Sequence, residues 1–257
     1  MQRLREYLFS ANGRLPRMLN HRVGARARGS LMHILKESGN HLKRQTQIAL
    51  IMIILCIAAF AILLLISIPR MPFYFNAGAY EGTRALTIVF PIGGVFYFRR
   101  MYRNSWLGLE GERQVTRLLE SSLDNSYYLV NDVVYSNDKG KKRNIDHILL
   151  GPNAIFAIET KNWRGKFFYN PNYQAKSNAR WVQQTIMDSK VLGDRKIWVQ
   201  GVVVFLNYAQ TSNLSDEAVE VLEFSDLIGF ILNYRRHSFS PQELETVGQI
   251  LDQAGIS

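Results

Sequence analysis

One stretch of the chain shows no alternation between hydrophobic and polar positions. Ile48 to Ile68 is 21 residues long, has Ser67 as its one polar side chain and holds no charge. At the rise of an α-helix this length spans about 31 Å, close to the thickness of a hydrocarbon core. The run is too long and too far from Met1 for a cleavable signal peptide. The pattern therefore predicts a transmembrane helix.

A second hydrophobic run covers residues 85–98 and is only 14 residues long, with Pro91 and two glycines inside it. Taken alone, it fits either a short span or a re-entrant segment. Three arginines follow it at once, whereas the 69–84 loop holds two arginines against one acid. Because Lys and Arg stay on the cytoplasmic side, this asymmetry predicts a hairpin of two spans, 48–68 and about 83–98. A single span would place the rest of the chain on the opposite side.

The formal charge of +10 is unevenly distributed along the chain. Residues 1–104 carry 15 Lys and Arg against three acids, whereas residues 105–257 carry 16 against 18, a net charge of −2. Residues 1–47 form a basic N-terminal arm with ten of these cations. The arm is expected to set the membrane topology and to attract anionic lipid; attraction of nucleic acid is a weaker alternative. The one cysteine, Cys56, excludes an intrachain disulfide.

From residue 105 onward the hydrophobic positions follow the periods of a soluble α/β domain. Helical periodicity marks 107–119, 178–192, 225–234 and a segment that begins with a capping box at Ser240. Runs rich in β-branched and aromatic residues predict strands at 127–135, 144–150, 155–161, 197–206 and 219–224. We expect a central mixed sheet flanked by helices over residues 105–257. The part after Leu206 carries no motif with a chemical meaning.

Polar side chains interrupt two of the apolar strands. Asp146 lies in the first, and Glu159 and Lys161 lie in the second, two residues apart and therefore on one face of the sheet. If the turn between the strands is centred on Pro152 and Asn153, position 146 lies opposite position 159, with Cβ atoms about 4.5–5.5 Å apart. A bulge at the turn would shift this register by one residue.

Two carboxylates at that distance repel each other unless a positive charge lies between them. A divalent cation with hard oxygen ligands is the natural occupant, and Lys161 would lie beside it to orient a water. This is the equipment for metal-assisted hydrolysis of a phosphodiester. The alternative is a surface Glu159–Lys161 pair and an edge-strand charge at Asp146, because single acids and Glu-x-Lys pairs are common.

The ordered motifs resemble the nuclease-related domain (NERD) of the PD-(D/E)xK nuclease superfamily. They are Gly108-Leu-Glu-Gly-Glu112, Asn144-Ile-Asp-His147, Ile158-Glu-Thr-Lys-Asn162 and Asn170-Pro-Asn-Tyr-Gln174. The resemblance covers about residues 106–206 and implies a restriction-endonuclease-like α/β fold. It implies Asp146 and Glu159 as ligands of Mg²⁺ or Mn²⁺, with Glu112 as an auxiliary acid at the metal. It further implies that Lys161 positions the water, that Gln174 steadies the substrate or the lysine, and that DNA is the substrate.

A basic loop directly precedes the strand of Asp146. Charged loops are usually only solvated, but beside a phosphate-cleaving site this one is the best candidate for nucleic-acid contact. Its cations are Lys139, Lys141, Lys142 and Arg143. His147 alternates away from Asp146, so we expect a buried role for it and not metal ligation.

The sequence thus predicts a metal-dependent nuclease at the cytoplasmic face of the cell inner membrane. Two alternatives stay open. One is a catalytically silent, membrane-tethered module that binds nucleic acid or protein. The other is a structural membrane protein whose basic arm organises anionic lipid.

Overall fold

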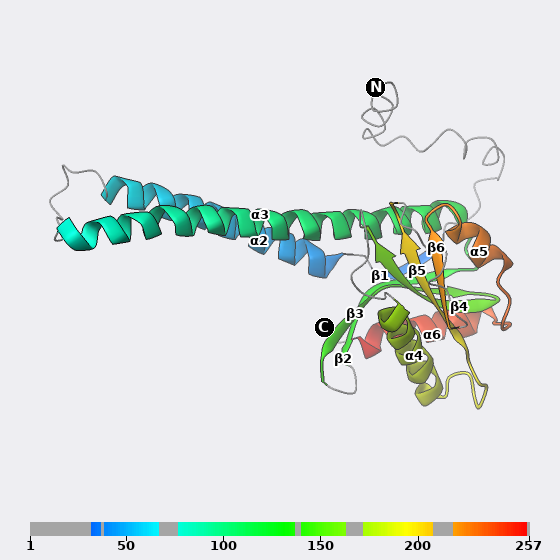
Figure 1. The fold of residues 1–257 in the computed structure, drawn as a ribbon. Coiled ribbons are helices and arrows are strands. Elements are labelled where there is room, and N and C mark those ends of the chain that lie inside the picture. The colour runs from blue at the N-terminus through cyan, green and yellow to red at the C-terminus, as the bar shows by residue number, and fades with distance from the viewer. Residues whose placement is uncertain are drawn as a thin grey trace, which may run out of the picture.

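The computed structural model describes residues 32–36, 39–66, 77–136, 140–162, 172–207 and 218–255. A long helical hairpin projects from an α/β domain (Figure 1). The hairpin consists of α2 (Asn40–Ile66) and α3 (Ala77–Ser122). Most of the predicted N-terminal arm, residues 1–31, lies outside the described residues, as does the whole loop between the helices, residues 67–76.

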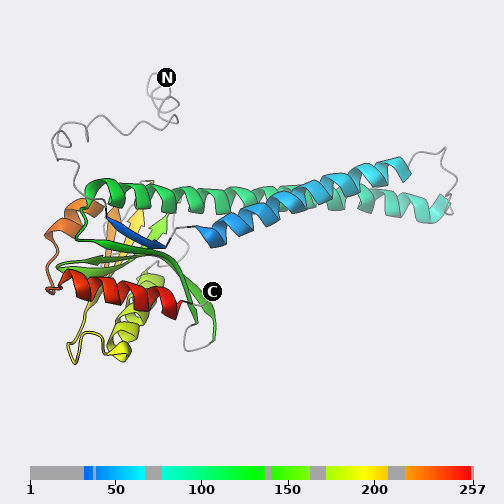
Figure 2. The same ribbon diagram turned by 180° about the vertical axis from the view of Figure 1, so that it is seen from behind.

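The two helices of the hairpin run side by side in opposite directions (Figures 1 and 2). Among the described residues, one helix segment is long and apolar enough to cross a membrane: Leu42–Leu64, 23 residues with a mean hydropathy of 3.0 and only 6% of its most apolar window buried. The helices approach closely at Gly94, where a Cβ would lie 2.8 Å from Cys56 Sγ.

The second hydrophobic run and the helix predicted at 107–119 are parts of one helix, α3, which is 46 residues long. Their separation into two elements was therefore wrong. Pro91 lies inside the helix and does not end it. One unbroken helix thus carries both the predicted second span and Glu112.

The domain is built on a mixed sheet of six strands in the order β1-β2-β3-β4-β5-β6. The β2–β3 and β3–β4 pairs are antiparallel, whereas the β1–β2, β4–β5 and β5–β6 pairs are parallel. The mixed α/β architecture is therefore as predicted. The strands are β1 (His33–Lys36), β2 (Tyr128–Ser136), β3 (Lys142–Gly151), β4 (Ala154–Lys161), β5 (Val199–Phe205) and β6 (Val219–Glu223).

Strand β1 comes from the segment that sequence analysis placed in the basic arm. His33 pairs with Tyr128 and Ile34 with Leu129 at the edge of the sheet. The side-chain amide of Asn131 also donates to the Lys36 carbonyl oxygen at 2.9 Å. The sheet is therefore completed by a strand that precedes α2, and a domain bounded at residue 105 leaves this strand out.

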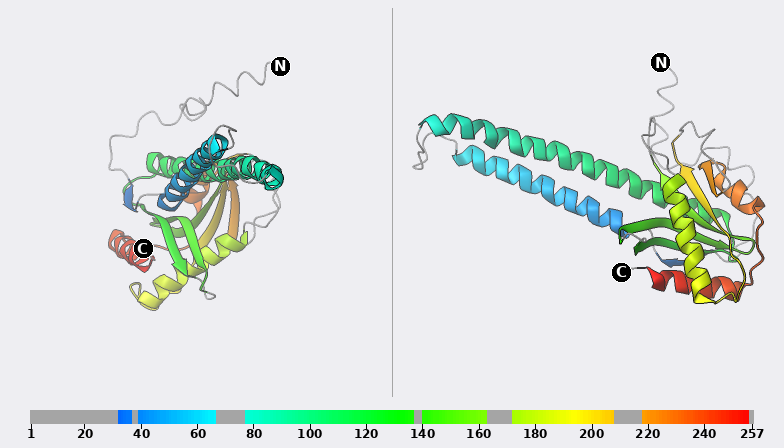
Figure 3. Two further views of the ribbon diagram at one scale, coloured as in Figure 1. Left: turned by 90° about the vertical axis from the view of Figure 1, so that its left-hand side faces the viewer. Right: turned by 60° about the horizontal axis from the view of Figure 1, so that its bottom comes forward.

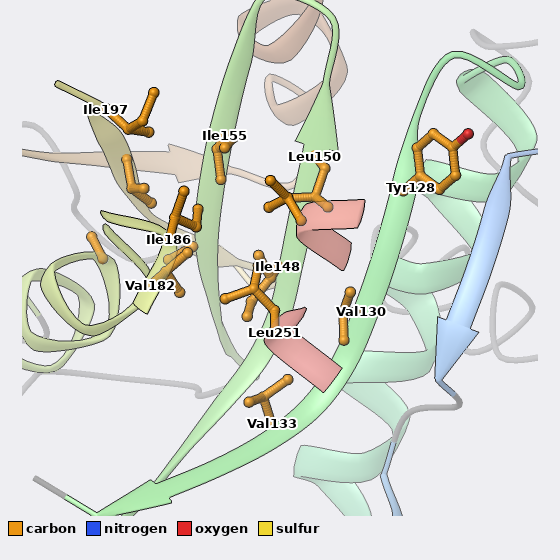
Figure 4. Packing of buried hydrophobic residues seen from close by; sticks show 14 of the residues in the cluster. Tyr128, Val130, Val133, Ile148, Leu150, Ile155, Val182, Ile186, Ile197 and Leu251 are labelled. Atoms are coloured by element: carbon orange, nitrogen blue, oxygen red, sulfur yellow. The ribbon is translucent and has the colours of Figure 1, made fainter. Parts of the chain in front are cut away.

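Helices cover both faces of the sheet, as Figure 3 shows. On one face, α4 (Asn172–Ser189) and α6 (Pro241–Ala254) pack on a core that includes Ile148, Val182 and Leu251 (Figure 4). On the other face, the end of α3 and the short α5 (Leu227–Asn233) pack on a core that contains Phe156 and Ile158. The predicted capping box at Ser240 is present at the start of α6.

Candidate active site

The candidate site lies where β3 and β4 stop pairing with each other. Their ladder runs from Gly151–Ala154 at the turn to His147–Ile158, which is the register predicted from the sequence. One residue beyond this ladder, Asp146 Oδ2 accepts a hydrogen bond of 2.7 Å from the Thr160 backbone N–H. The side chain of Asp146 therefore bridges to β4 at the point where the two strands diverge.

Glu159 and Lys161 form a buried ion pair on the next strand. Lys161 Nζ lies 2.6 Å from Glu159 Oε1, and the two side chains are only 8% and 4% exposed. Ile155 and Ala157 of the same strand face the core under α4, so the alternation of β4 directs Glu159 and Lys161 toward α4 as well. From that helix, Gln174 Oε1 lies 3.5 Å from Lys161 Nζ, a long contact.

Glu112 reaches the same place from the other side, on α3. A Cβ on the preceding residue, Gly111, would lie 2.9 Å from Asn162 Cβ, so α3 rests directly on the end of β4. Asn162 Nδ2 donates to the Leu107 carbonyl oxygen at 2.7 Å and ties the helix to the strand. Glu112 itself is 5% exposed. Glu112, Asp146, Glu159 and Lys161 are thus all buried, and the charges of the other three act on Glu112.

The acids of this group influence one another electrostatically. Burial, followed by the charges of Asp146, Asp132 and Glu159, raises the pKa of Glu112 from 4.5 to about 10. Burial and the Glu159 charge also raise the pKa of Asp146 well above its usual value, against the opposing effects of Lys161 and the Thr160 N–H. Burial raises the pKa of Glu159 too, although Lys161 lowers it. One lysine thus faces an excess of buried carboxyl groups.

Sequence reasoning missed Asp132, a further acid of the site. It is 5% exposed and lies across from Asp146, between the Asn131–His147 and Val133–Ile145 pairs of β2 and β3. Its φ of 54° is in the left-handed region, which is uncommon for a residue other than glycine. The polar Asn131-Asp132 pair in the middle of an apolar strand was the available signal.

The regular alternation of side chains also breaks at this point. Val130 and Ile148 belong to the core under α4 and α6, and so do Val133 and Ile145, at an odd separation along each strand. Strict alternation would have placed Val133 and Ile145 on the opposite face. The alternation of side chains is therefore interrupted in both β2 and β3 at the position of Asp132 and Asp146.

Comparison with known proteins places the acids and Lys161 in a described domain family. Residues 107–206 match the family model described as a nuclease-related domain, NERD. Residues 107–206 form a nuclease-related domain. A curated protein of Bacillus anthracis, described as uncharacterized, is 30% identical over 98 residues, which are 38% of this chain and 42% of that protein. The chain thus spans less than half the length of this relative.

The nuclease-related domain extends from the end of α3 through β5 and contains the described acids and Lys161. Strand β1, strand β6 and helices α5 and α6 lie outside the matched residues. The match therefore includes the site but not the whole sheet that supports it.

His147 of this domain is completely buried. Its Nδ1 lies 2.7 Å from Asn131 Oδ1. Because Asn131 Nδ2 donates to the Lys36 carbonyl, Oδ1 is the acceptor and His147 Nδ1 carries the hydrogen. Burial lowers the pKa of His147 to about 3, so the ring is neutral. This agrees with the buried role predicted for it.

The basic loop beside the nuclease-related domain's site is described in part. Lys139 lies outside the described residues, and Lys141 and Lys142 are exposed. Arg143 is half-buried, and its charge lowers the pKa of Glu159. Arg143 therefore acts electrostatically on the site.

The acids of the site are chemically suited to bind a divalent cation. Asp146, Glu159 and Glu112 supply hard carboxylate oxygens in a buried place with an excess of negative charge, which a cation would offset. In the part of the chain that the structure describes, no three His, Cys, Asp or Glu side chains gather in an arrangement that could hold a metal ion. Binding would therefore require these side chains to readjust.

Proposed function

We propose that this protein is a membrane-anchored, metal-dependent nuclease of the PD-(D/E)xK type that hydrolyses phosphodiester bonds, with DNA as its substrate. The observation that carries the proposal is the buried group of Glu112, Asp146 and Glu159 around Lys161 inside a nuclease-related domain. Acids whose pKa values are raised by burial and by neighbouring charges are typical of functional sites.

The proposal assigns a role to each residue. Asp146 and Glu159 would hold Mg²⁺ or Mn²⁺, and Glu112 would support the cation or its water. A bound divalent cation supplies Lewis-acid stabilisation and lowers the pKa of water. Lys161, placed 2.6 Å from Glu159 Oε1, orients the nucleophilic water, and Gln174 steadies the ammonium group. The basic loop at Lys139, Lys141, Lys142 and Arg143 contacts the phosphate backbone.

The proposed anchor is the α2–α3 hairpin in the cell inner membrane, with both ends in the cytoplasm and basic residues against anionic lipid. Sheet topology supports two spans. Strand β1 precedes α2, yet it pairs with β2, which follows α3. The chain therefore lies on the same side of any membrane before α2 and after α3, and a crossing by α2 needs a return crossing by α3.

The test uses the full chain purified in detergent, with plasmid DNA, linear DNA and RNA as substrates. We expect cleavage that needs Mg²⁺ or Mn²⁺ and stops with chelator. Asp146→Asn and Lys161→Ala should each reduce the rate by at least about 100-fold. The controls Asp188→Asn and Lys196→Ala change exposed residues of the same types and should cleave like the wild type. Cleavage that survives both site substitutions overturns the assignment, and binding without cleavage favours the silent module instead.

A further inference from the structure

Glu159 is held at both of its carboxylate oxygens. Lys161 Nζ lies 2.6 Å from Oε1, and the side-chain amide of Asn178 donates to Oε2 at 3.1 Å. Asn178 lies on α4 and is only 1% exposed. A buried carboxylate held from two directions has little freedom to rotate, so these contacts determine where its acceptor orbitals point.

Tyr135 holds the opposite end of the Asn178 side-chain amide. The Tyr135 hydroxyl donates to Asn178 Oδ1 at 3.0 Å, so Oδ1 is the acceptor and Nδ2 is the end that faces Glu159. Nδ2 also lies 3.4 Å from the Asn144 carbonyl oxygen. The Tyr135 ring stacks on Trp181 with centroids 4.7 Å apart. These contacts exclude the flipped amide, which would place its oxygen against a carboxylate.

Helix α4 therefore presents two amides, one turn apart, to the two members of the buried ion pair. Gln174 faces Lys161, and Asn178 faces Glu159. We propose that Asn178 is a positioning residue that orients Glu159 for cation binding, and that Tyr135 acts through Asn178. The inference rests on the proposed function, because the orientation of the Glu159 carboxylate matters only if Glu159 binds a cation. Partners that hold a ligating carboxylate are worth about 10–100-fold in metal affinity.

The experiment measures Mn²⁺ affinity by calorimetry on the full chain in detergent, together with the Mn²⁺ dependence of cleavage. Asn178→Ala should weaken Mn²⁺ binding by about 10–100-fold while kcat at saturating Mn²⁺ changes much less. Tyr135→Phe keeps the amide and loses one hydrogen bond, so it should weaken binding by about fivefold. Adding Tyr135→Phe to Asn178→Ala should have little further effect, because both act on one group.

Asn233→Ala is the matched control. Asn233 Nδ2 donates to the Gly229 carbonyl oxygen at 2.8 Å on the exposed side of α5, so its loss should leave Mn²⁺ affinity unchanged. If Asn178→Ala fails to fold, Tyr135→Phe still decides the question. Wild-type Mn²⁺ affinity in the folded site variants, with or without a lower melting temperature, overturns the inference. A wild-type chain that neither binds Mn²⁺ nor cleaves overturns the proposed function itself, and the role of Asn178 with it.

Discussion

The side-chain amide of Asn131 donates to the Lys36 carbonyl oxygen at 2.9 Å, across 95 residues of sequence. Lys36 precedes α2 and Asn131 follows α3, so this bond joins the two ends of the hairpin within one sheet. Asn131 also accepts from His147, the neighbour of Asp146. The segment ahead of the hairpin is thus connected through two side chains to the strand that carries the candidate site.

This connection puts both ends of the hairpin on one side of the proposed membrane, and the proposed topology makes that side the cytoplasm. In a Cys56→Ser background, single cysteines at His33 and Gln253, both exposed, should be protected from a membrane-impermeant thiol reagent in intact spheroplasts and labelled after lysis. A cysteine at Asn76, between the two helices, should be labelled from outside. Labelling of one domain position but not the other in intact cells would contradict a single domain that contains both β1 and α6.

Substitution by alanine should have opposite effects on stability at two helical glycines, because α3 lies close to β4 at Gly111 whereas α5 has open space at Gly229. A Cβ at Gly111 would lie 2.9 Å from Asn162 Cβ and 3.3 Å from Thr160 Cγ2, so Gly111→Ala should push α3 outward, move Glu112 and reduce both stability and cleavage. At Gly229 nothing lies within 4 Å of the added Cβ, so Gly229→Ala should stabilise α5 by about 0.5–1 kcal/mol. Thermal unfolding and cleavage assays of both variants check this. If the two variants changed stability and cleavage in the same way, α3 would have room to move away from Asn162.

The buried ion pair makes a prediction that needs no enzymatic activity. Lys161→Met leaves Glu159 buried without its cation, and removing one partner of such a pair lowers the free energy of unfolding by about 3–5 kcal/mol. The double variant Glu159→Gln/Lys161→Met removes both charges and should recover most of that stability. Thermal unfolding of the two variants in detergent measures the difference. A double variant as unstable as Lys161→Met would mean that packing, and not charge, dominates at this position.

Local patterns were enough to predict the register of β3 and β4 and the shared face of Glu159 and Lys161, whereas the predicted Asp146–Glu159 pair lies just beyond the ladder. A two-residue turn sets the register of β3 and β4, and that register extends from Gly151–Ala154 to the edge of the site. Alternation along β4 then places Glu159 and Lys161 on one face. These relationships involve residues close in sequence, so no tertiary information was required.

The features of the fold and the site that could not be predicted depend on contacts between segments distant in the sequence. Strand β1 is four residues long and pairs with a strand more than 90 residues away, so its own pattern carries little signal. The left-handed backbone of Asp132 is held by the surrounding sheet and not by local preference. In the sequence, Asn178 resembles a solvated polar residue of a helix, because its burial depends on the packing of α4 on β4. Pro91 was taken as an interruption, yet α3 continues through it.

The raised pKa of Glu112 predicts how stability depends on pH in the absence of divalent cations. The unfolded chain loses this proton near pH 4.5, whereas the folded chain keeps it up to about pH 10. The unfolded state therefore binds fewer protons between these values, and the free energy of unfolding falls as pH rises. The contribution is fully present below pH 4.5 and is lost as pH rises toward 10. His147, with a pKa of about 3, has the opposite effect, but only below its unfolded value of 6.5.

The range from pH 7 to pH 9 therefore isolates the effect of the acids. Glu112→Gln does not titrate, so it should remove up to about 1.4 kcal/mol per pH unit from the loss of stability with rising pH. Any loss that persists in this variant would come from Asp146 or Glu159, whose pKa values are raised as well. Thermal unfolding of the wild type and Glu112→Gln at both pH values measures the change, with the exposed Glu245→Gln as control. Parallel pH dependences for all three proteins would mean that Glu112 is already ionised in the folded chain at pH 7, and its raised pKa would then be wrong.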